Sequence, residues 1–83
     1  MAKKATKSLR SPAHLALRQI LVNGRKKAGL TQAETAAALG WPQSDISKVE
    51  TGERRLDVIE FLQLCEAIGI DPTAVIDQLQ AAQ

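Results

Sequence analysis

Residues 29–52 read GLTQAETAAALGWPQSDISKVETG, a stretch with a capping or helix-ending residue at each joint of two short helices. Thr31 with Glu34 three positions later has the pattern of a capping box, in which each side chain accepts a hydrogen bond from the other residue's amide. The alanine-rich run that follows has high helix propensity. Gly40 can adopt the left-handed conformation that ends a helix. We therefore predict a short helix over 32–39.

A second short helix is predicted over 43–50, directly after the first. Pro42 suits a first helical position, because its missing N–H is not needed there. Gly52 is expected to end the helix. Because about three residues separate the two helices, they must cross at a steep angle, and Ala36 is the small residue expected where their backbones approach. The unit is a helix-turn-helix, which makes DNA the leading ligand.

The outward face of the second helix is predicted to be polar. Glutamine can bond adenine with two hydrogen bonds and lysine favours guanine, and a recognition helix meets bases near its N-terminus. We therefore expect Gln43, Ser44 and Lys48 to read bases; the alternative is an ordinary solvated helix face. Asp45 would either accept a hydrogen bond from a cytosine amino group or point aside, because phosphates repel a carboxylate.

Further motifs extend the pattern over most of the chain. They are Arg25, the run Gly29-Leu30-Thr31-Gln32, Ala36, Leu39-Gly40, Ile46-Ser47, Glu50 with Gly52, and Leu64 to Ile70. In this combination the segment from about 15 to 79 resembles the phage repressor and Cro-type (Xre) helix-turn-helix family. The resemblance implies an all-α, compact five-helix domain that dimerises and binds operator DNA. The chain departs from the family at Thr35, Trp41 and Pro42.

The resemblance also implies roles for individual side chains. Arg25 and Glu50 would form a buried ion pair that links the first helix to the third. The amide of Gln32 would contact a phosphate with the support of the helix N-terminus; simple N-terminal polarity is the alternative. Independently of the family, Arg54 and Arg55 follow the second helix of the motif, where they could hold the DNA backbone or be solvated charges at the rim.

Basic residues are concentrated at the start of the chain. Residues 1–27 carry eight of the 11 lysines and arginines and none of the nine acidic residues. Such asymmetry is typical of an electrostatic footprint on phosphate. We expect Lys26 and Lys27, beside the helix-turn-helix, to contact the DNA backbone. Residues 1–10 are interpreted as a flexible basic arm, with a solvated tag-like tail as the alternative.

Three more helices are predicted, so that residues 11–83 form a single helix-turn-helix domain. Ser11-Pro12 is an N-cap followed by proline, which begins a helix over about 12–28. Asn23-Gly24 could break this helix into two pieces. We expect it to be continuous, because glycine would allow close packing on that face.

A second capping box, formed by Asp57 and Glu60, begins a helix that runs to Ile68. Apolar side chains cover most of its circumference, so we expect other helices and a partner to enclose it. The last helix carries Val75 and Leu79, which are our candidates for a dimer contact. The alternative is that both complete the core of the monomer.

Composition argues against catalysis and against a membrane protein. The chain has one histidine, one cysteine and no tyrosine, with no metal-ligand spacing and no phosphate-binding glycine loop. We expect no enzyme activity, no cofactor and no metal site, and a structural, buried Cys65. No apolar run of about 18 residues and no signal peptide are present, which favours a cytoplasmic protein.

Two functions fit these observations. The first is sequence-specific binding of double-stranded DNA by a homodimer at an inverted repeat, to regulate transcription, with the helix over 43–50 in the major groove. The second is an antitoxin-like module that neutralises a partner protein and also binds DNA. We rank the second lower, because few residues are free at either end of the domain to wrap a partner.

Overall fold

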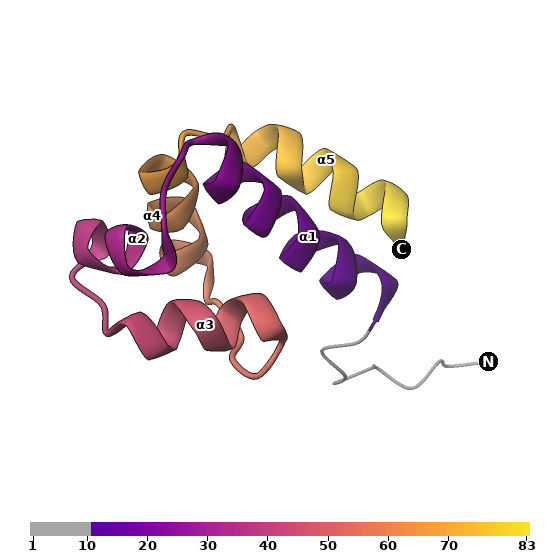
Figure 1. Ribbon diagram of the computed structural model, residues 1–83. Coiled ribbons are helices and arrows are strands. Elements are labelled where there is room, and N and C mark those ends of the chain that lie inside the picture. The colour runs from indigo at the N-terminus through magenta and orange to yellow at the C-terminus, as the bar shows by residue number, and fades with distance from the viewer. Residues whose placement is uncertain (1–10) are drawn as a thin grey trace.

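The computed structural model describes residues 11–83, which fold into helices joined by short loops, with no strand in that range. The helices are α1 (Pro12–Lys27), α2 (Gln32–Leu39), α3 (Gln43–Thr51), α4 (Val58–Ile68) and α5 (Pro72–Ala82). Figure 1 shows α1 packed beside α5, with α2 and α3 at the opposite side. The all-α, five-helix fold is confirmed. The arm expected over residues 1–10 lies outside the described residues.

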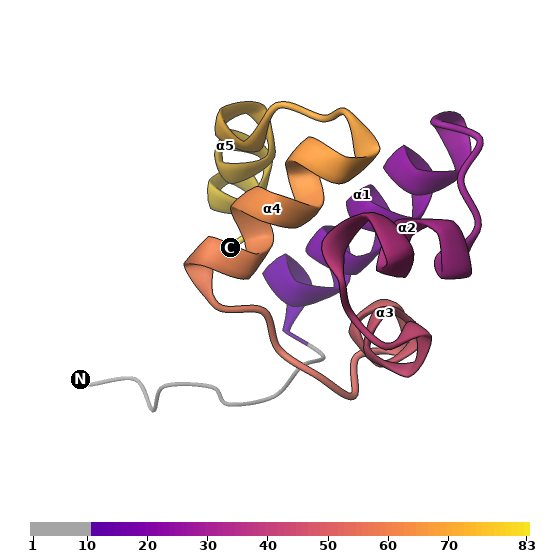
Figure 2. The ribbon, with the colours of Figure 1, turned by 90° about the vertical axis from the view of Figure 1, so that its left-hand side faces the viewer.

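The helix-turn-helix is formed by α2 and α3. Figure 1 shows α3 lengthwise and α2 nearly end-on, whereas Figure 2 shows α2 lengthwise and α3 end-on, so the two helices cross steeply. Ala36 is 2% exposed and belongs to the same buried cluster as Ile46 and Val49. Its single methyl group lets the two helix backbones approach, as the sequence predicts.

Side-chain caps place the helix boundaries close to those predicted. Thr31 Oγ1 accepts from the Glu34 amide at 3.0 Å, and Glu34 Oε1 accepts from the Thr31 amide at 2.9 Å. Asp57 and Glu60 repeat this capping box at the start of α4. Gly40 ends α2 with a φ of 71°, a left-handed conformation that favours glycine. Local hydrogen bonding therefore decides where these elements start and stop.

Pro42 differs from the expectation that it is the first residue of a helix. It is the N-cap of α3, with φ of −61° and ψ of 143°, and the helix begins at Gln43. The proline ring fixes only φ, and this φ suits both helical and extended backbone. Pro42 therefore precedes the helix and is not its first residue, whereas the predicted helix start at residue 43 is confirmed. Pro42 gives α3 no side-chain cap.

The core consists of two adjoining clusters. Leu21, Ile46 and Leu64 represent the larger one, which joins α1, α3 and α4. Phe61, Cys65 and Val75 form the smaller one between α4 and α5. Cys65 is fully buried, and burial, with a smaller contribution from Asp71, raises the pKa of its thiol to about 11. The thiol therefore packs as a small apolar group.

Helix α1 runs unbroken through Gly24, as expected. A Cβ at this position would lie 3.0 Å from Ile70 Cγ2 and 3.2 Å from Ile68 Cδ1. The missing side chain therefore gives room to the end of α4 and to the loop that follows. This close approach explains a glycine inside a helix, where it is less favourable than alanine by about 1 kcal/mol.

Helix α4 is less enclosed than its apolar sequence predicts. Val58 is 71% exposed and Ile59 is 63% exposed. They lie in the first turn of α4, and Val58 lines an open groove shared with α1 and α5. Val75 of α5 is 3% exposed and completes the monomer core. This corrects its candidacy as a dimer contact, because a side chain inside the monomer offers no surface to a second copy.

An open apolar groove of about 420 Å³ lies between α1, α4 and α5. Its lining includes Leu17, Leu56, Leu62, Ile76 and Leu79. Leu62 and Ile76 are each 44% exposed. Leu79, the other candidate dimer contact, is half-buried at this groove.

Candidate nucleic-acid interface

A largely buried ion pair joins α3 to α1. Arg25 Nε lies 2.6 Å from Glu50 Oε2, and Arg25 Nη2 donates to Glu50 Oε1 at 3.1 Å. The two side chains are only 11% and 10% exposed. This two-point contact fixes the relative orientation of the planar groups as well as their distance. The residues that the family resemblance pairs are therefore in contact.

The same carboxylate also holds α2. Gln32 Nε2 donates to Glu50 Oε1 at 2.9 Å, and Arg25 Nη1 donates to the Leu30 carbonyl at 2.8 Å. Gln32 was expected to face a phosphate. Its amide nitrogen carries two N–H groups, so one bond to Glu50 leaves the second for another acceptor. The network joins three helices at one point.

Arg18 adds a contact that the sequence analysis missed. Its Nε donates to the Glu50 carbonyl at 3.2 Å, near the C-terminus of α3. A cation there is favourable, because the last carbonyls of a helix carry partial negative charge. Gly52 makes room for it: a Cβ at Gly52 would lie 2.8 Å from Arg18 Nη1. One feature of the sequence could have indicated this contact: Arg18 lies seven residues before Arg25, and therefore on the same helix face.

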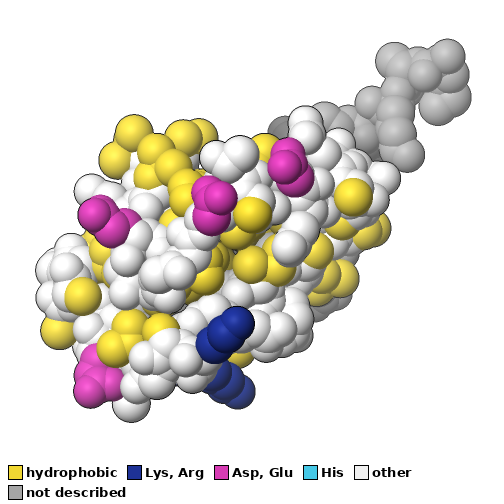
Figure 3. All heavy atoms as spheres, turned by 90° about the horizontal axis from the view of Figure 1, so that it is seen from above, with side chains coloured by type: hydrophobic (Ala, Val, Ile, Leu, Met, Phe, Trp, Pro, Cys, Tyr) yellow, Lys and Arg dark blue, Asp and Glu magenta, His cyan; other side chains and the backbone are white. Residues whose placement is uncertain are grey.

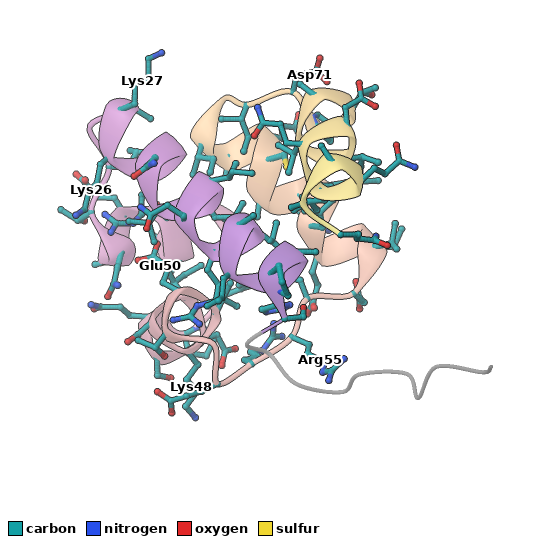
Figure 4. All side chains as sticks on the ribbon, turned by 90° about the vertical axis from the view of Figure 1, so that its right-hand side faces the viewer. Lys26, Lys27, Lys48, Glu50, Arg55 and Asp71 are labelled. Atoms are coloured by element: carbon teal, nitrogen blue, oxygen red, sulfur yellow. The ribbon has the colours of Figure 1, made fainter. Side chains whose placement is uncertain are left out.

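The predicted base-reading side chains lie on the solvent side of α3. Gln43, Ser44 and Lys48 are exposed, whereas Ile46 and Val49 are buried. With about 100° between successive residues, the three exposed side chains share one arc of the helix. Figure 4 shows Lys48 pointing away from the helices into solvent. Asp45 is half-buried in the first turn of α3, where the helix dipole favours a carboxylate.

The other basic candidates do not all lie near α3. Lys26 and Lys27 are exposed in the last turn of α1. Figure 4 shows Lys27 at the end of the molecule opposite Lys48, whereas Arg55 lies at the same end as Lys48. The face seen from above, opposite α3, carries acidic and apolar side chains and few basic ones (Figure 3). The structure thus separates Lys27 from the predicted reading face.

The guanidinium of Arg54 contacts side chains of the same domain. Its Nη2 lies 2.7 Å from Glu60 Oε2, and its guanidinium carbon lies 5.2 Å from the centre of the Trp41 ring. The hydrogen bond from Arg54, followed by the bond with the Asp57 backbone, lowers the pKa of Glu60, and the Glu60 bond raises the pKa of Arg54. Trp41 itself is half-buried and packs on the larger core cluster.

No group of three or more histidine, cysteine, aspartate or glutamate side chains in residues 11–83 could hold a metal ion. Partial burial, with the charges of Arg18 and Arg55, lowers the pKa of His14. None of the helices in this part of the chain has the length and apolar character needed to cross a membrane.

Comparisons with known proteins agree with this geometry. Residues 23–75 match the model of the helix-turn-helix family. An uncharacterised HTH-type transcriptional regulator, y4dJ from Sinorhizobium fredii, is 35% identical over 52 residues, which are 63% of this chain and 68% of that protein.

Two solved structures are also similar. An Xre-family-like protein from Pseudomonas syringae pv. tomato has 49% identity and a TM-score of 0.83, with 95% of this chain and 96% of that chain covered. The restriction-modification controller protein C.AhdI from Aeromonas hydrophila has 30% identity and a TM-score of 0.67, with 74% and 92% covered.

Arg25→Ala is expected to destabilise the fold by about 3–5 kcal/mol, because it leaves the Glu50 carboxylate buried without its counter-charge. Urea unfolding followed by circular dichroism measures this loss. Lys26→Ala is the matched control: it removes one cation from the next, exposed position and should change stability by less than about 0.5 kcal/mol. Equal unfolding curves for Arg25→Ala and wild type would show that the pair does not hold the fold.

Proposed function

Because the chain belongs to the Xre-type helix-turn-helix family of DNA-binding transcriptional regulators, we propose that it recognises a specific double-stranded DNA sequence with α3 in the major groove. The observation that carries the proposal is the polar, exposed arc of α3, held on a rigid base by the Arg25–Glu50 pair. Rigid presentation matters, because base readout depends on hydrogen-bond geometry.

Side-chain chemistry suggests how the arc reads sequence. Gln43 and Ser44 lie in the first turn of α3, the part of a recognition helix that contacts base edges. Gln43 would bond the N6 and N7 atoms of adenine, and Lys48 would donate to O6 and N7 of guanine. Ser44 can donate or accept, so it adapts to either base.

Contacts to the phosphates would position α3 without reading sequence. Gln32 lies at the first turn of α2, where the helix N-terminus attracts anions. Lys26 and Arg55 are exposed cations, and Arg55 lies at the same end of the molecule as Lys48. Lys27 points elsewhere and would add only long-range attraction.

We further propose that the protein acts as a homodimer through the groove between α1, α4 and α5. The groove is apolar, and Leu62 and Ile76 at its edge are large enough to enter the same groove of a second copy. Helix α5 carries a single charged residue, Asp77, so two copies would meet with little charge repulsion. A two-fold axis would present two α3 helices to half-sites about 34 Å apart.

Lys48→Ala is expected to weaken discrimination at one base pair of each half-site by about 1–3 kcal/mol. Duplexes selected by the wild-type protein from a randomised pool supply the probe, and fluorescence anisotropy with excess random competitor measures binding. Lys27→Ala is the control with the same charge change, and its discrimination should equal that of wild type. If the wild-type protein selects no sequence, DNA recognition is contradicted and an antitoxin-like role with a protein partner becomes the better proposal.

Ile76→Asp is expected to convert a dimer into a monomer, because each copy would place a carboxylate in the apolar groove of its partner. Sedimentation velocity measures the mass. Gln78→Asp introduces the same charge at an exposed position of α5 outside the groove lining and should leave the dimer intact. A wild-type protein that sediments as a monomer at all accessible concentrations would contradict the proposed dimer.

A further inference from the structure

Arg54 returns to the start of α3 although it follows the end of that helix. Its backbone N–H donates to the Lys48 carbonyl at 3.2 Å, which folds the segment after Gly52 back onto α3. Its guanidinium then lies over the ring of Trp41. Trp41 immediately precedes Pro42, the N-cap of α3. One side chain therefore joins the segments before and after the helix.

The other partner of Arg54 is anchored in α4. The guanidinium donates to both carboxylate oxygens of Glu60, at 2.7 and 3.4 Å, and to the Arg55 carbonyl at 3.2 Å. Glu60 is itself held, because its Oε1 accepts from the Asp57 amide at 3.0 Å in the capping box of α4. Helix α4 continues into the core through Leu64. Arg54 thus connects the turn before α3 to the helix that carries the core residue Leu64.

The start of α3 needs such support more than its end does. At the C-terminal end, Arg25 and Arg18 both contact Glu50. At the N-terminal end, Pro42 makes no side-chain cap. The Trp41–Arg54–Glu60 stack lies beside this uncapped end, which is the part of a recognition helix that meets the bases.

We infer that Arg54 is a positioning residue, which sets the orientation of the N-terminal turn of α3 through Trp41 and Glu60 and so determines how selectively the protein reads DNA. The inference rests on the proposed DNA recognition. It differs from a role for Arg54 as a phosphate contact, because the guanidinium binds Glu60 and faces Trp41. A DNA phosphate would have to displace these contacts or approach the Glu60 carboxylate.

Glu60→Gln separates the two roles by the sign of its effect. Glutamine preserves the capping box but removes the charge that holds Arg54. The positioning role predicts about two- to fivefold weaker discrimination between selected and random duplexes, the size of one exposed cation–π contact. A phosphate role predicts equal or tighter DNA binding, because a negative charge is lost and Arg54 is released.

Glu34→Gln is the matched control for Glu60→Gln. Glu34 makes the same two capping bonds with Thr31 at the start of α2, so the variant loses one negative charge and keeps its cap. Its discrimination should be undiminished. The fluorescence of Trp41, the only tryptophan of the chain, should shift in Glu60→Gln and in Arg54→Ala, and should be unchanged in Glu34→Gln.

The salt dependence of Arg54→Ala gives a second test. The positioning role predicts weaker discrimination with the same slope of log affinity against log salt as wild type. Loss of a phosphate contact would reduce the slope by about 0.9. Arg54→Lys keeps the positive charge but not the planar fork that binds both oxygens of Glu60, and it should remain less selective than wild type.

Two results would overturn the inference in distinguishable ways. A wild-type protein that selects no DNA sequence removes the proposed function and the inference together. If the wild-type protein is selective, either of two results overturns the inference alone. Glu60→Gln could be as selective as Glu34→Gln, or Arg54→Ala could show a reduced salt slope. Circular dichroism at the assay temperature verifies that each variant is folded.

Discussion

The contact between Arg25 and Glu50 joins α1 to α3, and the same carboxylate also binds Gln32 of α2. Removing two charges from water carries a penalty of several kcal/mol per ion, whereas burying one leucine side chain contributes about 1.5–3 kcal/mol. The desolvation penalty of the pair is therefore offset only by good hydrogen-bond geometry. Arg25 makes two bonds to the Glu50 carboxylate, and Gln32 makes a third. Burial of apolar side chains favours a compact chain, and we expect the ion pair to favour the one orientation of α3 in which both bonds form.

In this orientation α3 has one face packed in the core and one face exposed to solvent. Ile46 and Val49 face the core, with Ala36 providing close approach to α2. The opposite side presents Gln43, Ser44 and Lys48 to solvent. The acidic and apolar face of the domain lies on the side away from α3 (Figure 3), so the charge distribution and the packing favour the same approach for a polyanion. Fold and proposed function thus depend on the same few contacts.

The sequence was sufficient for features that depend on neighbouring residues. The capping boxes of Thr31 with Glu34 and of Asp57 with Glu60 satisfy helix amides within one turn, so a helix start can be recognised from residues three apart. Family resemblance paired Arg25 with Glu50. The sequence was insufficient for contacts set by tertiary packing: Arg54 meets Trp41 only because the segment after α3 folds back. Pro42 was misplaced because its fixed φ does not determine ψ.

A double-mutant cycle measures how strongly Arg25 and Glu50 interact. Arg25→Met, Glu50→Met and the double variant would be compared by urea unfolding. The coupling is expected to exceed the effect of either single substitution, about 3–5 kcal/mol, and the double variant should be more stable than either single variant, because an isolated buried charge is worse than none. Single effects that add to within about 0.5 kcal/mol would contradict it.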